Sequence, residues 1–119
     1  AWVVDKKIDM EKIKNIFYLF KGEKNYFSFS KHGSSFKTYE REIEIKIIRK
    51  NKWVFMDFFG KSFLYQMIRK IVGTLVMYSL DRIDKQTIEK AFLIQDRTIL
   101  KEIAPPQGLY LIKIIYNNG

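Results

Sequence analysis

The chain has 119 residues, 47% of them hydrophobic, which suits one domain with a sizeable core. It contains no cysteine, which excludes disulfides, zinc-thiolate sites and a cysteine nucleophile. No run of about 18 apolar residues is present, so no transmembrane helix is expected. The net charge of +9 suits a polyanionic partner such as RNA. A general abundance of lysine would give the same charge without any dedicated site, so both interpretations stay open.

The first third of the chain predicts a helix, an aromatic segment and a loop. Asp9 is suited to cap a helix that runs to about Phe20, and Gly22 is suited to end it. The expected inward side chains are Met10, Ile13, Ile16, Phe17 and Phe20. An aromatic core segment over residues 26–29 and a mobile loop over residues 30–37 should follow.

Two strands and a tight turn are predicted next. Residues 38–50 alternate between apolar and polar side chains, which indicates a strand with one buried face. That face carries Ile43, Ile45 and Ile47. Arg41 has the same parity and should point toward the buried side near the start of the strand. Residues 53–59 form the second strand of a hairpin. Their apolar character on both faces predicts either coverage on both sides or a partner.

The strongest helix pattern starts near Ser62 and runs to about Ser79. At about 100° per residue, one apolar stripe is expected to face the core. The stripe consists of Leu64, Met67, Ile68, Ile71, Val72, Leu75 and Tyr78. Arg69 falls far from this stripe, on the same side as Ser62, Tyr65 and Gly73. Arg69 is therefore either a solvated surface arginine beside a tolerated glycine or an arginine aimed at something outside this domain.

The last third predicts a short helix and a final strand. Asp84 should cap a helix over about residues 85–94. This helix is expected to bury Ile88, Ala91 and Phe92. Residues 96–103 give no clear signal, and residues 104–108 form a rigid turn. The final strand, residues 109–116, is expected to carry Tyr110, Ile112, Ile114 and Tyr116 on one face.

This order of elements predicts an α+β fold with an antiparallel or mixed sheet and helices packed on one face. Residues 1–119 contain no linker or repeat and are interpreted as a single domain. The chain begins abruptly with an apolar run over residues 1–4, which favours a domain cut from a larger protein.

Residue chemistry alone does not predict an active site. Neither a glycine-rich phosphate loop nor a serine–histidine–acid set can be assembled. The single histidine, His32, reads as a solvated loop residue and not as a metal ligand. Asp57 is the one carboxylate on an otherwise aromatic strand; it could act as an acid or base, but a structural cap at the strand end is the commoner role. No cofactor and no metal are expected.

Two motifs nevertheless carry a family resemblance. They are Phe63–Gly73, FLYQMIRKIVG, and Ala104–Leu111, APPQGLYL. Further agreements in order and spacing are Trp2, Asp9, Gly22, Phe29, Arg41-Glu42-Ile43 and Tyr116. Over essentially its whole length the chain resembles the C-terminal half of the tRNA pseudouridine synthase A family. It departs from that family at Lys24-Asn25, where a histidine–aspartate pair is usual, and at Tyr26, where phenylalanine is common.

The resemblance implies an isomerase without a cofactor. In the family an aspartate initiates cleavage of the uridine N-glycosidic bond, and the detached uracil turns and is rejoined to ribose through carbon. That aspartate, in a glycine-arginine-threonine-aspartate segment, and a uridine-stacking tyrosine belong to the N-terminal catalytic half and are absent from this chain. The arginine that matches Arg69 pairs with the aspartate across the cleft, because a nearby guanidinium keeps a buried carboxylate ionised. We therefore expect the 119 residues alone to fold and to be inactive.

The resemblance also implies substrate-binding residues and partners. Leu109 matches the apolar residue that lines the uracil pocket, with Tyr65 and Gly108 nearby, and Arg41 is a further candidate substrate-binding residue. The implied substrate is the anticodon stem-loop of tRNA, and the implied partners are the N-terminal catalytic domain and a second copy in a homodimer. A cytoplasmic location without membrane contact is expected.

Two other interpretations stay open. The first is a non-catalytic RNA-binding or protein-interaction module of the same fold. The second is a self-contained basic α+β scaffold with no preference for tRNA over random RNA.

Overall fold

The computed structural model describes residues 9–30, 38–50, 53–64, 66–100 and 110–116. Four strands form one sheet in the order β1-β2-β3-β4. Their bounds are Glu23–Asn25 for β1, Glu40–Lys50 for β2, Trp53–Gly60 for β3 and Tyr110–Tyr116 for β4. The three α-helices are α1 (Met10–Lys14), α2 (Met67–Ser79) and α3 (Lys85–Leu93). Three 3-10 turns complete the order: η1 (Phe17–Phe20), η2 (Phe27–Phe29) and η3 (Arg97–Ile99).

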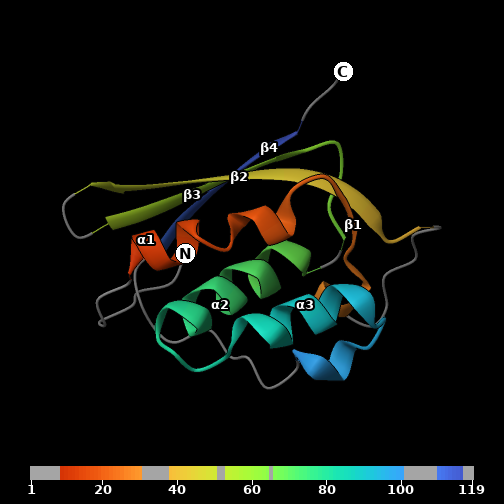
Figure 1. The fold of residues 1–119 in the computed structure, drawn as a ribbon. Helices are drawn as coiled ribbons and strands as arrows, with labels where there is room; N and C mark the ends of the chain where they lie inside the picture. The colour runs from red at the N-terminus through yellow and green to blue at the C-terminus, as the bar shows by residue number, and fades with distance from the viewer. Residues whose placement is uncertain (1–8, 31–37, 51–52, 65, 101–109, 117–119) are drawn as a thin grey trace.

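The predicted α+β class with a mixed sheet is confirmed. Strands β1, β2 and β3 pair in antiparallel fashion, and β4 is parallel to β3. The helices lie together on one side of the sheet, as Figure 1 shows. Of the loop predicted over residues 30–37, only Ser30 is described, and it is buried at the end of η2. Residues 31–37, which include His32, and the turn over 104–108 lie outside the described residues.

The period-two pattern in β2 and β3 corresponds to one buried and one more exposed face, as predicted. Ile43 and Ile47 of β2 and Met56 and Phe58 of β3 are buried, whereas Ile48, on the other face, is 48% exposed. The hairpin register joins Lys50 to Trp53, as the tight turn predicted. The second face of β3 is not fully covered within this chain, because Phe55, Asp57 and Phe59 are only half-buried; the alternative, a partner on this face, stays a prediction.

The first helix is shorter than predicted. Asp9 caps α1 by accepting a hydrogen bond from the Lys12 amide, at 3.1 Å. The α-helix nevertheless ends at Lys14: Asn15 is its C-cap, and Ile16 leaves helical geometry with φ −108° and ψ 3°. The 3-10 turn that follows sends the Phe20 ring into edge contact with two other aromatic rings. A continuous helix to Phe20 is therefore wrong, although Ile13, Ile16 and Phe20 are buried as expected.

The α2 helix forms the centre of the core. Every residue of the predicted stripe is at most 8% exposed except Tyr78, which is half-buried. The helix begins at Met67 and not near Ser62, because Gln66 adopts a left-handed conformation with φ 63°. Gly73, predicted to lie on the same side of the helix as Arg69, is buried, so α2 is covered at this position.

Helix α3 has nearly the bounds that its sequence predicts. The Asp84 carboxylate accepts hydrogen bonds from the Thr87 amide and hydroxyl, at 2.8 and 2.6 Å. Ile88 and Ala91 are buried, as expected from the apolar spacing. The helix ends at Leu93, which is 84% exposed.

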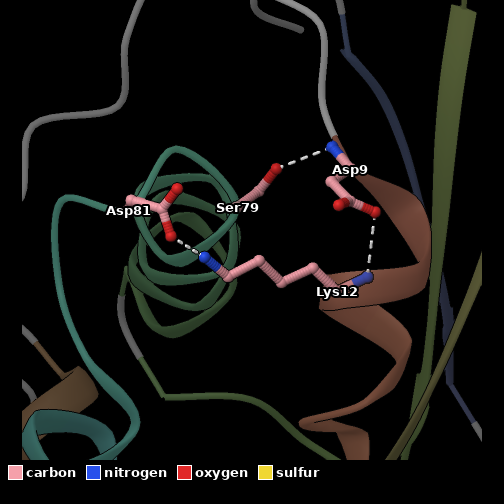
Figure 2. A network of polar contacts seen from close by, with 4 residues as sticks. All are labelled: Asp9, Lys12, Ser79 and Asp81. Atoms are coloured by element: carbon pink, nitrogen blue, oxygen red, sulfur yellow. Dashed lines mark hydrogen bonds and ion pairs between the residues drawn. The ribbon is translucent and has the colours of Figure 1, made fainter.

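A small polar network fastens α1 to the end of α2 (Figure 2). The Asp9 amide donates to the Ser79 hydroxyl at 2.8 Å, so the N-cap of one helix is bonded to the last residue of the other. The Lys12 ammonium forms an ion pair with Asp81 and lies 4.9 Å from the centre of the Tyr78 ring. Because the ion pair is largely exposed, it contributes at most about 1 kcal/mol, and the buried apolar contacts dominate the joint.

Four aromatic side chains close the core beneath η2. The rings of Phe20, Tyr26, Phe29 and Phe92 lie 5.0–6.0 Å apart in tilted or edge-on pairs. Tyr26 is fully buried, and its hydroxyl has no hydrogen-bond partner among the described residues. Burial raises the pKa of this phenol far above its ordinary value. The hydroxyl is thus an unfavourable group at a position where the family resemblance expects phenylalanine.

Replacing Tyr26 with phenylalanine should therefore stabilise the chain. The Tyr26→Phe variant keeps the ring contacts and removes a buried, unsatisfied hydroxyl, which should raise the free energy of unfolding by about 1 kcal/mol. Urea unfolding measures the change, and Tyr18→Phe, at a ring that is 53% exposed, is the control with an expected change below about 0.5 kcal/mol. A loss of stability in Tyr26→Phe would mean that the hydroxyl has a favourable partner.

Candidate functional site

The segment between β3 and α2 determines where Arg69 is presented. Phe63 folds back over Gly60, where a Cβ atom would lie 3.2 Å from the Phe63 ring. The Met67 amide then donates to the Leu64 carbonyl at 3.1 Å, and the Lys70 amide donates to the Gln66 carbonyl at 3.1 Å. These bonds start α2 directly below the end of the sheet at which β3 finishes (Figure 1).

Arg69 differs from the other residues of α2 in its exposure to solvent. All thirteen residues of this helix are described, and Arg69 is the one side chain among them that is exposed. Its neighbours along the helix, Ile68 and Lys70, are buried and half-buried. A long cationic side chain that leaves an otherwise covered helix is suited to contact a partner beyond this domain. The predicted off-stripe position of Arg69 is confirmed, whereas its proposed catalytic role stays a prediction.

Arg41 lies at the same end of the sheet. It pairs in register with Lys24 of β1, and its Nη1 donates to the Thr38 carbonyl at 3.0 Å and to the Glu40 carbonyl at 2.7 Å. A groove of about 530 Å³ opens beside it. The lining residues are Glu23, Thr38, Glu40, Arg41, Glu42, Lys61 and Ser62. Three carboxylates against two cations make this groove poorly suited to a phosphate, so a substrate role for Arg41 stays a prediction that its surroundings do not favour.

The other candidate substrate-binding residues, Tyr65, Gly108 and Leu109, lie outside the described residues. The described strand β4 begins at Tyr110. Tyr110 lies opposite Val54, at the end of the β3–β4 pair remote from Gly60. The described geometry therefore brings the segment before Arg69 close to Arg41 but does not bring the start of β4 to the same place.

Asp57 does not have the surroundings of a catalytic carboxylate. It lies inside β3 and not at its end, on the half-exposed face of the sheet, with Lys46 and Lys113 at its register positions. Partial exposure and two lysines at the register positions do not favour a carboxyl that acts as an acid or base, and a place inside the strand does not fit a cap.

Two negative observations apply to the described part of the chain. It holds no cluster of three or more histidine, cysteine, aspartate or glutamate residues that could bind a metal ion. Within the same residues, no helix has the length and apolar character needed to cross a membrane.

Sequence reasoning missed the contacts that hold Arg97. Arg97 of η3 lies in the segment that gave no clear signal, yet its guanidinium lies 4.1 Å from the centre of the Phe27 ring. Its Nε donates to the Ser30 hydroxyl at 3.1 Å. Burial lowers the pKa of Lys70 in α2, and the positive charge of Arg97 lowers it further. No local pattern could have revealed the contacts of Arg97, because Ser30 lies 67 residues away from it in the sequence.

Comparison with known proteins identifies the class to which this fold and the α2 motif belong. A family model described as tRNA pseudouridine synthase matches residues 16–117. The chain therefore belongs to the tRNA pseudouridine synthase family.

Individual relatives support this assignment and add information on length. The chain is 34% identical to tRNA pseudouridine synthase A of Syntrophomonas wolfei over 110 aligned residues. The alignment covers 92% of the chain and 44% of the relative. It is 34% identical over 117 residues to the protein of the same name in Thermoanaerobacter sp. X514, covering 98% of the chain and 48% of the relative. The Methylacidiphilum infernorum protein is 33% identical over 118 residues, with 98% and 46% covered. The chain thus spans slightly less than half the length of these relatives.

Proposed function

We propose that this chain is the C-terminal domain of a tRNA pseudouridine synthase, and that the complete protein converts uridine to pseudouridine in the anticodon stem-loop of tRNA. Family membership and the names of the relatives support the reaction and the substrate class. The observation that carries the role of this domain is the exposure of Arg69 on an otherwise covered helix.

In this proposal Arg69 acts on a carboxylate supplied by the other half of the protein. A nucleophilic aspartate in an active site that excludes water must remain ionised, and a guanidinium close to it favours the charged form. Arg69 faces away from the core of its own domain, which is the direction that such a contact requires. The target base must leave its stack to reach the nucleophile, so the domain also serves as a wall against which the extruded nucleotide is held.

The partners and the location follow from the same proposal. The polyanionic substrate fits the net charge of +9. A homodimer of the complete protein and a cytoplasmic location, where tRNA is modified, are part of the proposal. Residues Tyr65, Gly108 and Leu109 would contribute to the uracil pocket.

Mapping of modified positions tests this function. The complete protein, incubated with an unmodified tRNA transcript, is expected to form pseudouridine at uridines of the anticodon stem-loop and nowhere else in the tRNA. Pseudouridine confined to another arm would refute the anticodon assignment while leaving the family assignment intact.

The coding sequence upstream of Ala1 separates the enzyme from the non-catalytic module. A synthase requires a segment with the nucleophilic aspartate in the same reading frame. A reading frame without this segment would favour the binding module.

A further inference from the structure

Helix α2 begins in a different way from α1 and α3. Its N-cap residue, Gln66, adopts a left-handed conformation with φ 63° and ψ 6°, and the Gln66 side chain makes no capping hydrogen bond. An N-cap residue ordinarily has extended backbone angles, and its side chain accepts a hydrogen bond from the first turn of the helix. Asp9 and Asp84, the N-caps of α1 and α3, have both of these features. The start of α2 therefore departs from the pattern that the same chain uses elsewhere.

The left-handed conformation of Gln66 is unfavourable for a residue of its type. Glycine and asparagine adopt these angles readily, whereas in most other residues Cβ then lies too close to a carbonyl oxygen. Glutamine is moreover an ordinary helix former. The backbone at this position is thus held by its surroundings against the preference of the residue.

Asp81 provides a comparison at the other end of α2. It is the other non-glycine residue with a positive φ, 59°, in the part of the chain that the structure describes. The Asp81 amide donates to the Tyr78 carbonyl at 3.1 Å. The next amide, that of Arg82, donates to the Met77 carbonyl at 2.8 Å. These are the hydrogen bonds of a Schellman motif, which commonly ends a helix with a left-handed residue. The conformation of Asp81 is explained by this motif, and that of Gln66 is not.

The charges in the first turn of α2 are unfavourable as well. This turn holds no acidic residue, although it contains Arg69 and Lys70. The N-terminus of a helix carries a partial positive charge, which favours carboxylates there and disfavours cations. Two features that oppose the stability of α2 therefore coincide around Arg69. Strain that is retained in this way is typical of functional sites.

The conformation of Gln66 determines how Arg69 leaves the helix. The Lys70 amide donates to the Gln66 carbonyl at 3.1 Å, so Gln66 is bonded into the first turn. Arg69 is the third residue of α2. A helical side chain leans toward the N-terminus and lies over the turn that precedes it. Because α2 begins so close to Arg69, no complete helical turn precedes this residue, and its side chain can extend past the end of the helix.

We propose that Gln66 is a positioning residue, whose left-handed backbone starts α2 at Met67 and thereby directs the Arg69 guanidinium past the helix end toward the carboxylate on which it acts. The proposal rests on the proposed function, since it takes Arg69 to act on the nucleophilic aspartate. The role belongs to the backbone of Gln66 and not to its side-chain amide. A residue that adopts left-handed angles readily should therefore be able to replace glutamine.

A purely structural role of Gln66, that of joining β3 to α2, is the competing explanation. It predicts that a residue unsuited to left-handed angles lowers the stability of the protein but leaves the rate of the folded protein unchanged. It also predicts the same outcome for the equivalent change at Asp81.

Single-turnover formation of pseudouridine by the complete protein, at saturating protein, tests the proposal. Gln66→Val introduces a β-branched residue, which strongly disfavours left-handed angles. Its rate is expected to fall about tenfold or more, since a small misplacement of a catalytic group is costly. The affinity for tRNA should stay within about twofold, because no charge changes. Gln66→Gly and Gln66→Asn should keep the rate within about twofold, because both residues accept the left-handed conformation.

Asp81→Val is the matched control, since it introduces the same residue at a position with the same backbone conformation. It should lower the urea midpoint, as Gln66→Val should, but its rate should stay within about twofold of the wild-type rate. All rates are measured well below the unfolding transition, so that unfolded protein does not contribute to a loss. The glycine and asparagine variants test the proposal even where Gln66→Val does not fold.

Three results would overturn the positioning role. They are an unchanged rate in Gln66→Val, an equal loss of rate in Asp81→Val, and a loss in the glycine and asparagine variants as large as that in Gln66→Val. The last result would assign the effect to the side-chain amide. In each case the wild-type protein remains active, so the proposed function stands. A wild-type protein that forms no pseudouridine would overturn the proposed function as well.

Discussion

Replacing Arg69 with alanine in the complete protein is expected to lower the rate of pseudouridine formation at least about a hundredfold. The affinity for tRNA should change only a few-fold, because one surface charge among many contributes to the long-range attraction. Arg69→Lys is expected to lose most of the rate as well, since an ammonium lacks the planar pair of donors that fits a carboxylate. Single-turnover rates at saturating protein measure the chemical step without the binding step.

Arg82→Ala is the matched control for this experiment. Arg82 is an exposed arginine in the segment that follows α2, so its loss removes the same charge at a distance from the first turn. Its rate should remain within about twofold of the wild-type rate. An Arg69→Ala variant that also keeps its rate would return Arg69 to the class of solvated surface arginines.

The largest expected effect on stability is at Leu75. This side chain is fully buried in α2, and its truncation to alanine should cost about 2–5 kcal/mol because it leaves a cavity among core residues. Leu93 is the matched control, because the same leucine-to-alanine change can be made there on the surface. It is the last residue of α3, and its side chain is 84% exposed. Leu93→Ala should cost less than about 0.5 kcal/mol.

Urea unfolding of the two leucine variants tests whether α2 is the central helix. The urea midpoint of Leu75→Ala should lie clearly below that of Leu93→Ala. The m-values of the two variants should be equal, since the surface exposed on unfolding hardly differs between them. Equal midpoints would mean that α2 does not occupy the interior of the fold.

The elements that could be predicted from the sequence are those whose signal is local. The alternation of residues 38–50 and 53–59 is sufficient to predict β2 and β3, because period two and the short turn define a hairpin by themselves. Asp84 and the apolar spacing after it predict α3 in the same way. The position of Arg69 away from the core also follows from helix geometry alone.

The elements that could not be predicted depend on contacts distant in sequence. Strand β1 is only three polar residues, Glu23–Asn25, and exists because it pairs with β2. The first helix breaks near Asn15 so that Phe20 can join an aromatic cluster that includes Phe92. The left-handed conformation of Gln66 could not be predicted from the sequence, since glutamine is an ordinary helix former.

In the candidate site, too, local signals could be predicted from the sequence and contacts between distant residues could not. The α2 motif indicated Arg69 from the sequence through family resemblance, because this motif is a short and contiguous stretch of sequence. Arg97 carries no such motif, and its contacts become visible only when η3 is placed against Phe27.

Release of tritium from tRNA that carries tritium at carbon 5 of uridine tests the central claim, which is that this chain completes an active site without containing its nucleophile. The ring hydrogen is lost when uracil is rejoined to ribose through that carbon, so release measures the isomerisation directly. The complete protein is expected to release tritium, and the 119-residue chain alone, although folded, is expected to release none. Release by the 119-residue chain alone, or none by the complete protein, would contradict the account.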